Sequence, residues 1–196
     1  DLEHYGRDWT RRWLPSPLAI ALPATVEEVQ AVMRWAHQHR IAVVPSGGRT
    51  GLSGGAVAAN EELVLSLERM NRALDFNAVD RLLTVQAGMA LEAVHNTARD
   101  HGLQYPVDFA ARGSCSIGGN IATNAGGIRV IRYGNTREWI AGMKVVTGTG
   151  ELLDLNRGLV KNSSGYDLRH LMIASEGTLG IVVEATLRLT DPPPAS

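Results

Sequence analysis

The sequence predicts an α+β protein with at least one antiparallel sheet. Two segments, residues 25–40 and 91–102, carry apolar residues at helical spacing. Residues 143–155 form two β-rich runs around Gly148-Thr149-Gly150, which is the composition and spacing of a hairpin. Residues 178–190 are a long run in which apolar residues alternate with mostly polar ones, as in a half-buried strand. Helices combined with hairpin-connected strands are typical of α+β folds.

The first helix begins with a capping box. Thr25 and Glu28 have the Ser/Thr-x-x-Glu order, in which each side chain accepts a hydrogen bond from a backbone N–H group of the first turn. The apolar residues that repeat at helical spacing behind this cap are Val26, Val29, Val32, Met33 and Ala36. The second helix, residues 91–102, has one apolar face and ends at Gly102, because glycine is the preferred stop of a helix.

Short apolar runs predict the strands between and around these helices. Residues 41–44 form a run that Pro45 ends, which indicates a buried strand leading into a glycine-rich stretch. Residues 63–67 and 82–87 indicate two further strands. Strands and helices are therefore expected to alternate through the first hundred residues.

The composition is that of a soluble globular protein. The chain has 196 residues, 44% of them hydrophobic, and a formal net charge of -1, which gives no support for nucleic acid or an anionic membrane as a partner. No segment reaches the roughly 18 consecutive apolar residues of a transmembrane helix, and the first residues lack the order of a signal peptide. The single cysteine, Cys115, fits a reducing compartment. We therefore expect a cytoplasmic protein.

Three segments are unusually rich in glycine. Residues 43–55, VVPSGGRTGLSGG, and residues 113–127, GSCSIGGNIATNAGG, contain five glycines each, and residues 175–180, SEGTLG, contain two. Such clusters indicate a backbone that approaches a ligand closely and turns its N–H groups toward it, and the ligand that suits this best is a phosphate. The segments carry hydroxyls and amides but few charges, and only Arg49 in the first one could pair with a phosphate.

Two common phosphate-binding motifs are absent from the sequence. It contains no Gly-x-x-x-x-Gly-Lys-Ser/Thr, which argues against a P-loop nucleotide triphosphatase. It contains no Gly-x-Gly-x-x-Gly either, and residues 56–67 after the first glycine segment do not have the pattern of a helix that would hold a dinucleotide in the Rossmann manner. A dinucleotide scaffold of another kind remains.

The glycine segments resemble those of one superfamily of flavoenzymes. Together with RYGNTREWIAGMKVVTGTGELL and KNSSGYDLRHLMIASEGTLGI, they are similar in sequence and order to the FAD-binding (PCMH-type) domain of the vanillyl-alcohol-oxidase-type flavoenzymes. The D-2-hydroxyacid dehydrogenases, which act on D-lactate, glycolate or D-2-hydroxyglutarate, look most similar. The resemblance covers residues 18–191. It implies two α+β subdomains, one with a small parallel sheet and one with a larger antiparallel sheet flanked by helices, with FAD between them.

The resemblance also implies which residues bind FAD. The loop that would hold the pyrophosphate through backbone N–H groups comprises Ser46, Gly47, Gly48, Arg49, Thr50, Gly51, Leu52, Gly54 and Gly55. The residues that would line the ribityl and isoalloxazine part are Asp108, Ser114, Ile117, Gly118, Gly119, Asn120, Thr123, Asn124 and Gly127. Those expected on the adenosine or ribityl side are Glu176, Gly177 and Ile181.

Non-covalent binding of FAD is expected. Some relatives attach FAD through a histidine just after the first paired glycines, but here that position holds Arg49. Others use a cysteine in the second glycine segment. Cys115 lies in that segment, yet its spacing from Gly118 and Gly119 is shorter than that linkage implies, which favours a small buried thiol over a flavin attachment.

The resemblance implies that the whole protein oxidises a small D-2-hydroxy acid to the 2-oxo acid, with hydride transfer to flavin N5. In the relatives, the base, the cation that holds the substrate carboxylate and any metal come chiefly from a C-terminal substrate domain, so we assign no catalytic residue and expect no metal site here. The predicted division is an N-terminal extension (residues 1–17), the FAD-binding domain (18–191) and a Pro-rich linker (192–196) to that missing domain.

Two alternatives stay open at this point. The chain could be a stand-alone flavin-binding subunit without its own catalysis, or it could belong to another oxidase or reductase of the superfamily, such as an alcohol oxidase or a cell-wall precursor reductase. The sequence identifies neither the hydroxy acid nor the electron acceptor, because substrate specificity is expected in the absent domain.

Overall fold

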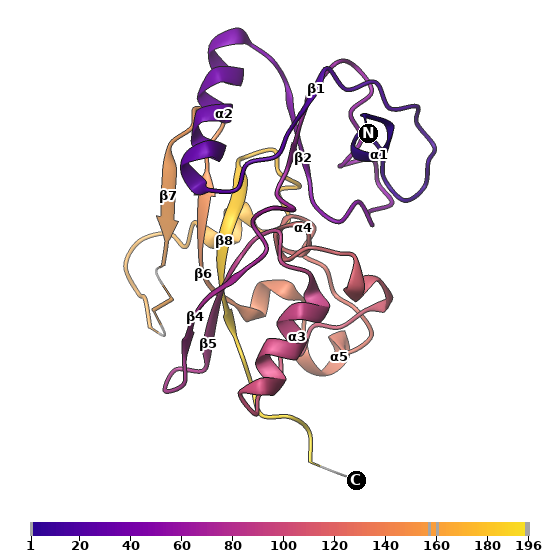
Figure 1. Cartoon of the computed structure of the whole chain (residues 1–196). Coiled ribbons are helices and arrows are strands. Elements are labelled where there is room, and N and C mark those ends of the chain that lie inside the picture. Colours follow the sequence, from indigo (N-terminus) through magenta and orange to yellow (C-terminus); the bar gives the residue numbers. More distant parts are fainter. Residues whose placement is uncertain (1, 157, 160, 195–196) are drawn as a thin grey trace.

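Two sheets of different size organise the chain. The structure is a computed structural model, and it describes residues 2–156, 158–159 and 161–194. A three-stranded parallel sheet has the order β1-β3-β2, and a five-stranded antiparallel sheet has the order β4-β5-β8-β6-β7. Figure 1 shows the small sheet above the large one, with the N-terminal residues beside the small sheet. The predicted α+β class with two subdomains is confirmed.

The small sheet is built around a fully buried central strand. Its strands are β1 (Ala19–Ala21), β3 (Leu63–Ser66) and β2 (Val43–Ser46), and every residue of β3 is buried. Helix α2 (Val26–His39) connects β1 to β2, and the Thr25 hydroxyl caps it by accepting the N–H group of Glu28 at 3.2 Å. The Glu28 carboxylate accepts the N–H group of Ala24 at 2.7 Å, one residue earlier than the capping box predicts.

Strand β2 differs from the prediction at both ends. It begins at Val43 and continues through Pro45 to Ser46, whereas the sequence predicted residues 41–44 with Pro45 as the stop. The reason is the position of β2 at the edge of the sheet, where proline costs no ladder hydrogen bond on the open side. The strand therefore runs directly into the first glycine segment.

The large sheet contains the predicted hairpin and the long last strand. Its strands are β4 (Ala73–Asn77), β5 (Leu82–Gln86), β8 (Ile181–Arg188), β6 (Ile140–Val146) and β7 (Leu152–Leu155). Strands β6 and β7 form the hairpin, with Gly150 at φ +83° in its turn. Strands β1 and β4 were not predicted, because β1 has only three residues and β4 lies largely exposed at the sheet edge.

Most helices other than α2 lie in connections within the large sheet, between β5 and β6 or between β7 and β8. Helix α3 (Leu91–Asp100) matches the second predicted helix, with Gly102 at φ +72° behind it. The remaining helices are short: α1 (Leu2–Tyr5), α4 (Ile117–Ala122), α5 (Val130–Tyr133) and α6 (Arg169–Met172), with 3-10 turns η1 (Ala110–Gly113) and η2 (Thr136–Trp139). Helix α4 packs against β8 and so places the second glycine segment on the large sheet.

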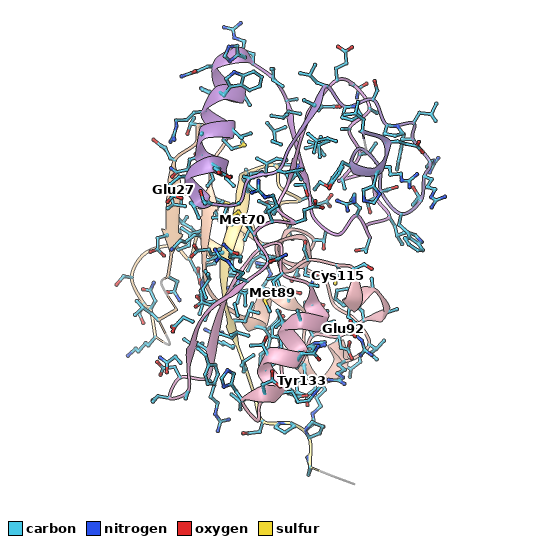
Figure 2. The ribbon with its side chains drawn as sticks, in the orientation of Figure 1. Glu27, Met70, Met89, Glu92, Cys115 and Tyr133 are labelled. Carbon is cyan, nitrogen blue, oxygen red and sulfur yellow. The ribbon has the colours of Figure 1, made fainter. Side chains whose placement is uncertain are left out.

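One continuous hydrophobic core joins the two subdomains. It contains residues of α2 and β3 from the small subdomain together with residues of α3, α4 and the large sheet. Met70 and Met89, both labelled in Figure 2, belong to this core, whereas Glu92 lies on the exposed side of α3. Because the core is shared, the relative placement of the glycine segments is fixed by packing and not by flexible connections.

Candidate cofactor site

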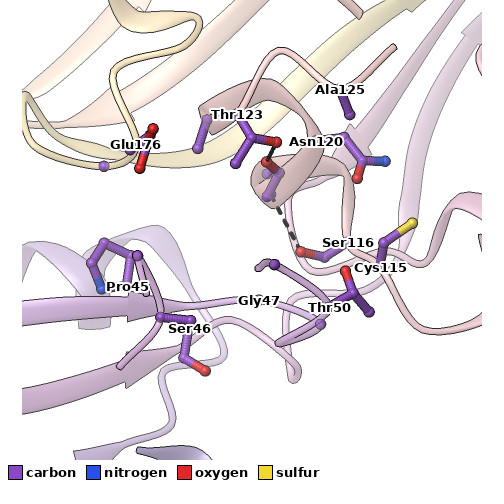
Figure 3. Close-up of a pocket in the computed structure, with 18 of the residues that line it drawn as sticks. Pro45, Ser46, Gly47, Thr50, Cys115, Ser116, Asn120, Thr123, Ala125 and Glu176 are labelled. Atoms are coloured by element: carbon purple, nitrogen blue, oxygen red, sulfur yellow. Dashed lines mark hydrogen bonds between the residues drawn. The ribbon is translucent and has the colours of Figure 1, made fainter. Parts of the chain in front are cut away.

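The three glycine segments surround one cavity between the two subdomains. The cavity has a volume of about 490 Å³. Figure 3 shows Pro45, Ser46 and Gly47 on one side of it and Glu176 and Thr123 on the other. The residues of the predicted site that line it are Ser46, Gly47, Gly48, Arg49, Thr50, Gly51, Leu52, Gly55, Gly118, Gly119, Asn120, Thr123, Glu176, Gly177 and Ile181.

Two glycines let the first segment lie directly against the second. A Cβ atom added to Gly47 would lie 2.3 Å from Ser116 Oγ, and one added to Gly48 would lie 1.9 Å from the carbonyl oxygen of Ser114. Neither position has room for a side chain. The loop after β2 therefore contacts the segment before α4 with its backbone, and residues of both segments line the cavity.

The backbone N–H groups of the first loop are available to a ligand. Among the residues that the structure describes, the N–H groups of Gly47, Gly48, Arg49, Thr50 and Gly51 donate no hydrogen bond. Arg49 has φ +56°, the left-handed conformation that alternates with right-handed residues in anion-binding nests of backbone amides. Five consecutive unpaired donors beside a cavity are expensive unless water or an anion satisfies them.

The Arg49 side chain adds a positive charge to this loop. Its Nη1 atom donates to the Ser46 hydroxyl at 3.3 Å and to the carbonyl oxygen of Gly47 at 3.2 Å, and its guanidinium lies 4.8 Å from the centre of the Tyr5 ring. No carboxylate of the described residues forms an ion pair with Arg49. The loop thus combines free N–H donors with an uncompensated cation.

The second segment presents a capped helix to the cavity. The Ser116 hydroxyl accepts the N–H group of Gly119 at 3.3 Å, the contact drawn as a dashed line in Figure 3. Asn120, on the same helix, is 4% exposed and lines the cavity, and its Nδ2 atom has no hydrogen-bond partner among the described residues. A buried amide donor without a partner indicates that a ligand or water completes it.

Replacing Ser116 by alanine tests this cap. We expect the free energy of unfolding to fall by about 1 kcal/mol, because the first turn of α4 loses its side-chain acceptor. Urea unfolding measures the change, with Ser163→Ala at an exposed position as the control. Equal stability of the two variants would show that the hydroxyl does not hold the helix.

The third segment joins the two sides of the cavity. Glu176 has φ +52°, and its N–H group donates to the carbonyl oxygen of Ala122 at the end of α4 at 2.8 Å. Gly177 has φ +78°, and a Cβ atom added there would lie 2.7 Å from Cγ of Pro45. The segment therefore touches α4 on the large subdomain and β2 on the small one.

Two arginines hold the chain just before the third segment. Arg169, 9% exposed, donates to the carbonyl oxygens of Ile140 and Ala141 at 2.8 and 2.6 Å. The side-chain hydrogen bonds and charge of Arg169 also lower the pKa of Asp167 below its usual value. Arg137 donates to the carbonyl oxygens of His170 and Ile173 at 3.0 and 3.1 Å. These contacts explain how a segment between a four-residue helix and β8 keeps a fixed position.

Six of the predicted residues do not line the cavity. They are Gly54, Asp108, Ser114, Ile117, Asn124 and Gly127. Gly54 donates its N–H group to Asp8 at 3.1 Å, and the Asn124 side chain accepts the N–H group of Arg137 at 3.0 Å. Asp108 is buried, with Arg112 and Arg129 each 3.5 Å from its carboxylate. These contacts support the walls around the cavity.

Residues outside the predicted set also line the cavity. They are Pro45, Ser53, Ala56, Leu67, Phe109, Ala111, Cys115, Ser116, Ala122, Ala125, Met172, Ser175, Gly180 and Val182. Most are apolar and lack a motif of their own, so the sequence offered little signal for them. Ser116 is the exception, because a serine directly before Ile117 and three residues before Gly119 has the position of a helix cap.

Cys115 lies in the cavity wall as a buried thiol. It is 3% exposed, and burial raises the pKa of its thiol above the usual value. The thiol therefore stays protonated at neutral pH and is a poor nucleophile. The structure does not place a group of three or more His, Cys, Asp and Glu side chains in a metal-binding arrangement anywhere in the described ranges.

The arrangement fits a long, partly anionic and partly apolar ligand. One end of the cavity offers free N–H groups and the Arg49 cation, and the remainder offers mainly apolar side chains with single polar groups such as the Asn120 amide. The cavity volume lies in the range of small-molecule and cofactor sites.

No helix within the described part of the chain is both long and apolar enough to cross a membrane.

Comparisons with known proteins agree with this geometry. A family model described as an FAD binding domain matches residues 17–156. A protein named D-2-hydroxyglutarate dehydrogenase from Xanthomonas citri pv. viticola is 85% identical over 196 residues, which make up 100% of this chain and 42% of that protein. A protein from Bos taurus named D-2-hydroxyglutarate dehydrogenase, mitochondrial, is 41% identical over 196 residues, or 36% of its length.

A solved structure shows the same fold. The chain superimposes on alkyldihydroxyacetonephosphate synthase with a TM-score of 0.79 at 27% identity, covering 90% of this chain and 32% of the other. The chain spans about two fifths of the length of the first two curated relatives it matches. The predicted boundaries at residues 17, 18 and 191 stay predictions, and residues 195–196 of the predicted linker lie outside the described residues.

Proposed function

Since this chain belongs to the FAD binding domain family, we propose that it is the cofactor-binding part of a dehydrogenase that oxidises D-2-hydroxyglutarate, or a closely related D-2-hydroxy acid, to the 2-oxo acid. The observation that carries the proposal is the 85% identity, over the whole chain, to a protein named D-2-hydroxyglutarate dehydrogenase. The cavity formed by the three glycine segments supports the same interpretation, because its first loop carries unpaired N–H groups and Arg49, which suit a pyrophosphate, and many of its other lining residues are apolar, which suits a flat ring.

The first loop is the best candidate for the pyrophosphate. The negative charge of a pyrophosphate is stabilised by N–H groups and by a cation. Residues 47–51 supply five unpaired N–H groups, and Arg49 supplies the positive charge. Glu176 and Gly177, on the opposite wall, belong to the predicted adenosine or ribityl side. We propose that the remaining predicted lining residues, Gly118, Gly119, Asn120 and Thr123, face the ribityl and isoalloxazine part.

The chemistry that bound FAD would supply is oxidation: the hydride of the substrate α-carbon would pass to the flavin, and the hydroxyl proton would pass to a base. The residues of this chain bind and orient. The first loop binds the pyrophosphate, and the buried Asn120 amide offers a directional hydrogen bond to the ribityl or isoalloxazine part. Apolar residues such as Met172 and Val182 exclude water. We propose that the base, and the cation that binds the substrate carboxylate, come from a further domain of the whole protein. The electron acceptor is unassigned.

Non-covalent binding of FAD is part of the proposal. Arg49 stands where some members of the superfamily have the histidine that carries FAD. The Cys115 thiol, whose pKa burial raises, is protonated at neutral pH and so lacks the reactivity that a flavin attachment needs.

The substrate is tested with the full product of the gene that encodes this chain. We expect D-2-hydroxyglutarate, added without oxygen, to bleach the absorption band of the bound flavin, with the 2-oxo acid appearing in equal amount. D-Lactate, glycolate and L-2-hydroxyglutarate serve as comparisons. Bleaching by an unrelated alcohol and not by any D-2-hydroxy acid would favour another oxidase or reductase of the superfamily. A flavin that no donor bleaches would favour the stand-alone flavin-binding subunit.

We propose the cytoplasm as the place where the whole protein works. The single cysteine supports a reducing compartment. Some relatives carry the word mitochondrial in their names. Cell fractionation with an antibody against the protein tests the proposal, and recovery in a membrane or organelle fraction would contradict it.

A further inference from the structure

We propose that the N-terminal segment, residues 2–16, is part of the cofactor site, and that Asp8 is a positioning residue for the first glycine loop. This inference rests on the proposed function, because it concerns how the loop is prepared for the FAD pyrophosphate. The segment lies outside residues 17–156, the part of the chain that the family model matches. In Figure 1 it lies at the upper right, beside the loop that follows β2.

The Asp8 carboxylate is buried and fully used in local hydrogen bonds. Asp8 is 3% exposed, the smallest exposed fraction of any acidic residue among the described buried groups. Its Oδ2 atom accepts the N–H group of Gly54 at 3.1 Å, and its Oδ1 atom accepts the N–H group and the hydroxyl of Thr10 at 3.0 and 2.7 Å. A buried carboxylate persists only with such partners, so it fixes Gly54 strongly.

Backbone contacts extend this attachment along the loop. The N–H group of Trp9 donates to the carbonyl oxygen of Gly51 at 3.3 Å, and the N–H group of Ala58 donates to the carbonyl oxygen of Gly6 at 3.0 Å. Gly54 has φ +85°, and a Cβ atom added there would lie 3.1 Å from the Trp13 ring. The segment therefore binds the loop at Gly51, Gly54 and Ala58, while residues 47–51 keep their N–H groups free.

The same segment also holds the cation of the loop. The Arg49 Nη2 atom lies 3.0 Å from the His4 Nε2 atom, and the Arg49 guanidinium lies over the Tyr5 ring. The Tyr5 hydroxyl in turn donates to the Glu68 carboxylate, which ties the segment to the chain after β3. Arg49 is thereby kept beside the cavity without a carboxylate that would neutralise it.

The two ends of the loop have different partners. Residues 2–16 bind the carbonyl oxygen of Gly51 and the N–H groups of Gly54 and Ala58, whereas the N–H groups of residues 47–51 are left for an anion. A loop of this glycine content has high conformational entropy when free, so holding it beforehand lowers the entropy lost when a ligand binds. Loss of the Asp8 contacts is expected to weaken binding even where the protein still folds.

The test measures cofactor affinity in the purified chain. We expect Asp8→Asn to raise the dissociation constant of FAD by about tenfold, since a charge-assisted contact is lost. The dissociation constant of ADP, which contains the pyrophosphate without the flavin, should rise by a similar factor. The matched control is Glu62→Gln, which changes a carboxylate that accepts the N–H group of Asn60 at 2.7 Å outside the cavity. This control should bind FAD as the unchanged chain does.

Several outcomes would overturn the inference. Unchanged FAD affinity in Asp8→Asn would do so, and so would weaker binding of FAD with unchanged binding of ADP, because the effect would not pass through the pyrophosphate. A lower melting temperature without a change in either dissociation constant would assign Asp8 a merely structural role. If Asp8→Asn does not fold, Thr10→Val removes one donor to the same carboxylate, and it should raise the FAD dissociation constant by about threefold.

The inference and the proposed function fail in different ways. If the unchanged chain binds FAD and Asp8→Asn and Thr10→Val bind it equally well, the inference is wrong and the proposed function stands. If the unchanged chain binds neither FAD nor ADP, both are wrong.

Discussion

Gly48→Ala is expected to remove most of the FAD affinity of this chain and to destabilise the apoprotein. The added Cβ atom would lie 1.9 Å from the carbonyl oxygen of Ser114 and 2.7 Å from Cα of Cys115. Both neighbours are backbone atoms, so no side-chain rotation relieves the collision, and the loop has to move away from the segment before α4. Overpacking of this kind costs about 1–3 kcal/mol. We expect the FAD dissociation constant to rise by at least about tenfold, as the displaced N–H groups lose their geometry.

A second glycine provides the control for that experiment. Gly148 lies in the turn between β6 and β7, and a Cβ atom added there meets nothing within 4 Å. Gly148→Ala should therefore leave FAD binding unchanged and stability nearly so. Urea unfolding and a fluorescence titration with FAD measure both quantities. If Gly48→Ala behaved like Gly148→Ala, the close contact between the first two glycine segments would not be needed for the site.

Arg49→Glu is expected to weaken FAD binding by about a hundredfold, or roughly 2.7 kcal/mol, because the cation that we propose to lie beside the pyrophosphate becomes an anion. Arg49 is the cation of the first loop, it lines the cavity, and no carboxylate of the described residues pairs with it. The same variant should bind riboflavin, which has no phosphate, as the unchanged chain does. A titration with both ligands separates the two contributions.

Arg40→Glu is the matched control for the charge reversal. Arg40 also has φ +56°, but it follows α2 and lies outside the cavity. This control has the same change in net charge, at a residue with the same backbone conformation. Its FAD dissociation constant should therefore stay within about twofold of that of the unchanged chain. Equal losses in both variants would mean that net charge, and not a local contact at the loop, governs binding.

The sequence predicted those parts of the fold that have a strong local signal. The capping box at Thr25, the helical period of residues 91–102 and the hairpin around Gly148 each appear in the structure near the expected positions. Strands β1 and β4 were not predicted, because their own residues carry little strand signal. They are strands because β1 pairs with β3 and β4 pairs with β5. Pro45 misled the strand prediction, since only the sheet order reveals that β2 is an edge.

The site shows the same division between local and long-range information. The glycine segments predicted a close backbone approach, which the structure shows at Gly47, Gly48 and Gly177. The family resemblance that these segments carry implied many of the residues that line the cavity. The apolar wall residues could not be identified, since Leu67 or Val182 looks like any other core residue until the chain is folded. Asp8 was placed in an extension outside the domain, and its contact with Gly54 spans 46 residues of sequence.

The most direct test of the account is an absorption spectrum of the purified chain saturated with FAD, recorded before and after denaturation and filtration. We predict flavin bands at roughly 370 and 450 nm that remain with the folded chain. After denaturation the flavin should pass through the filter, because we propose that it is bound without a covalent bond. A chain that retains no flavin after incubation with FAD would contradict the claim that the three glycine segments form its binding site.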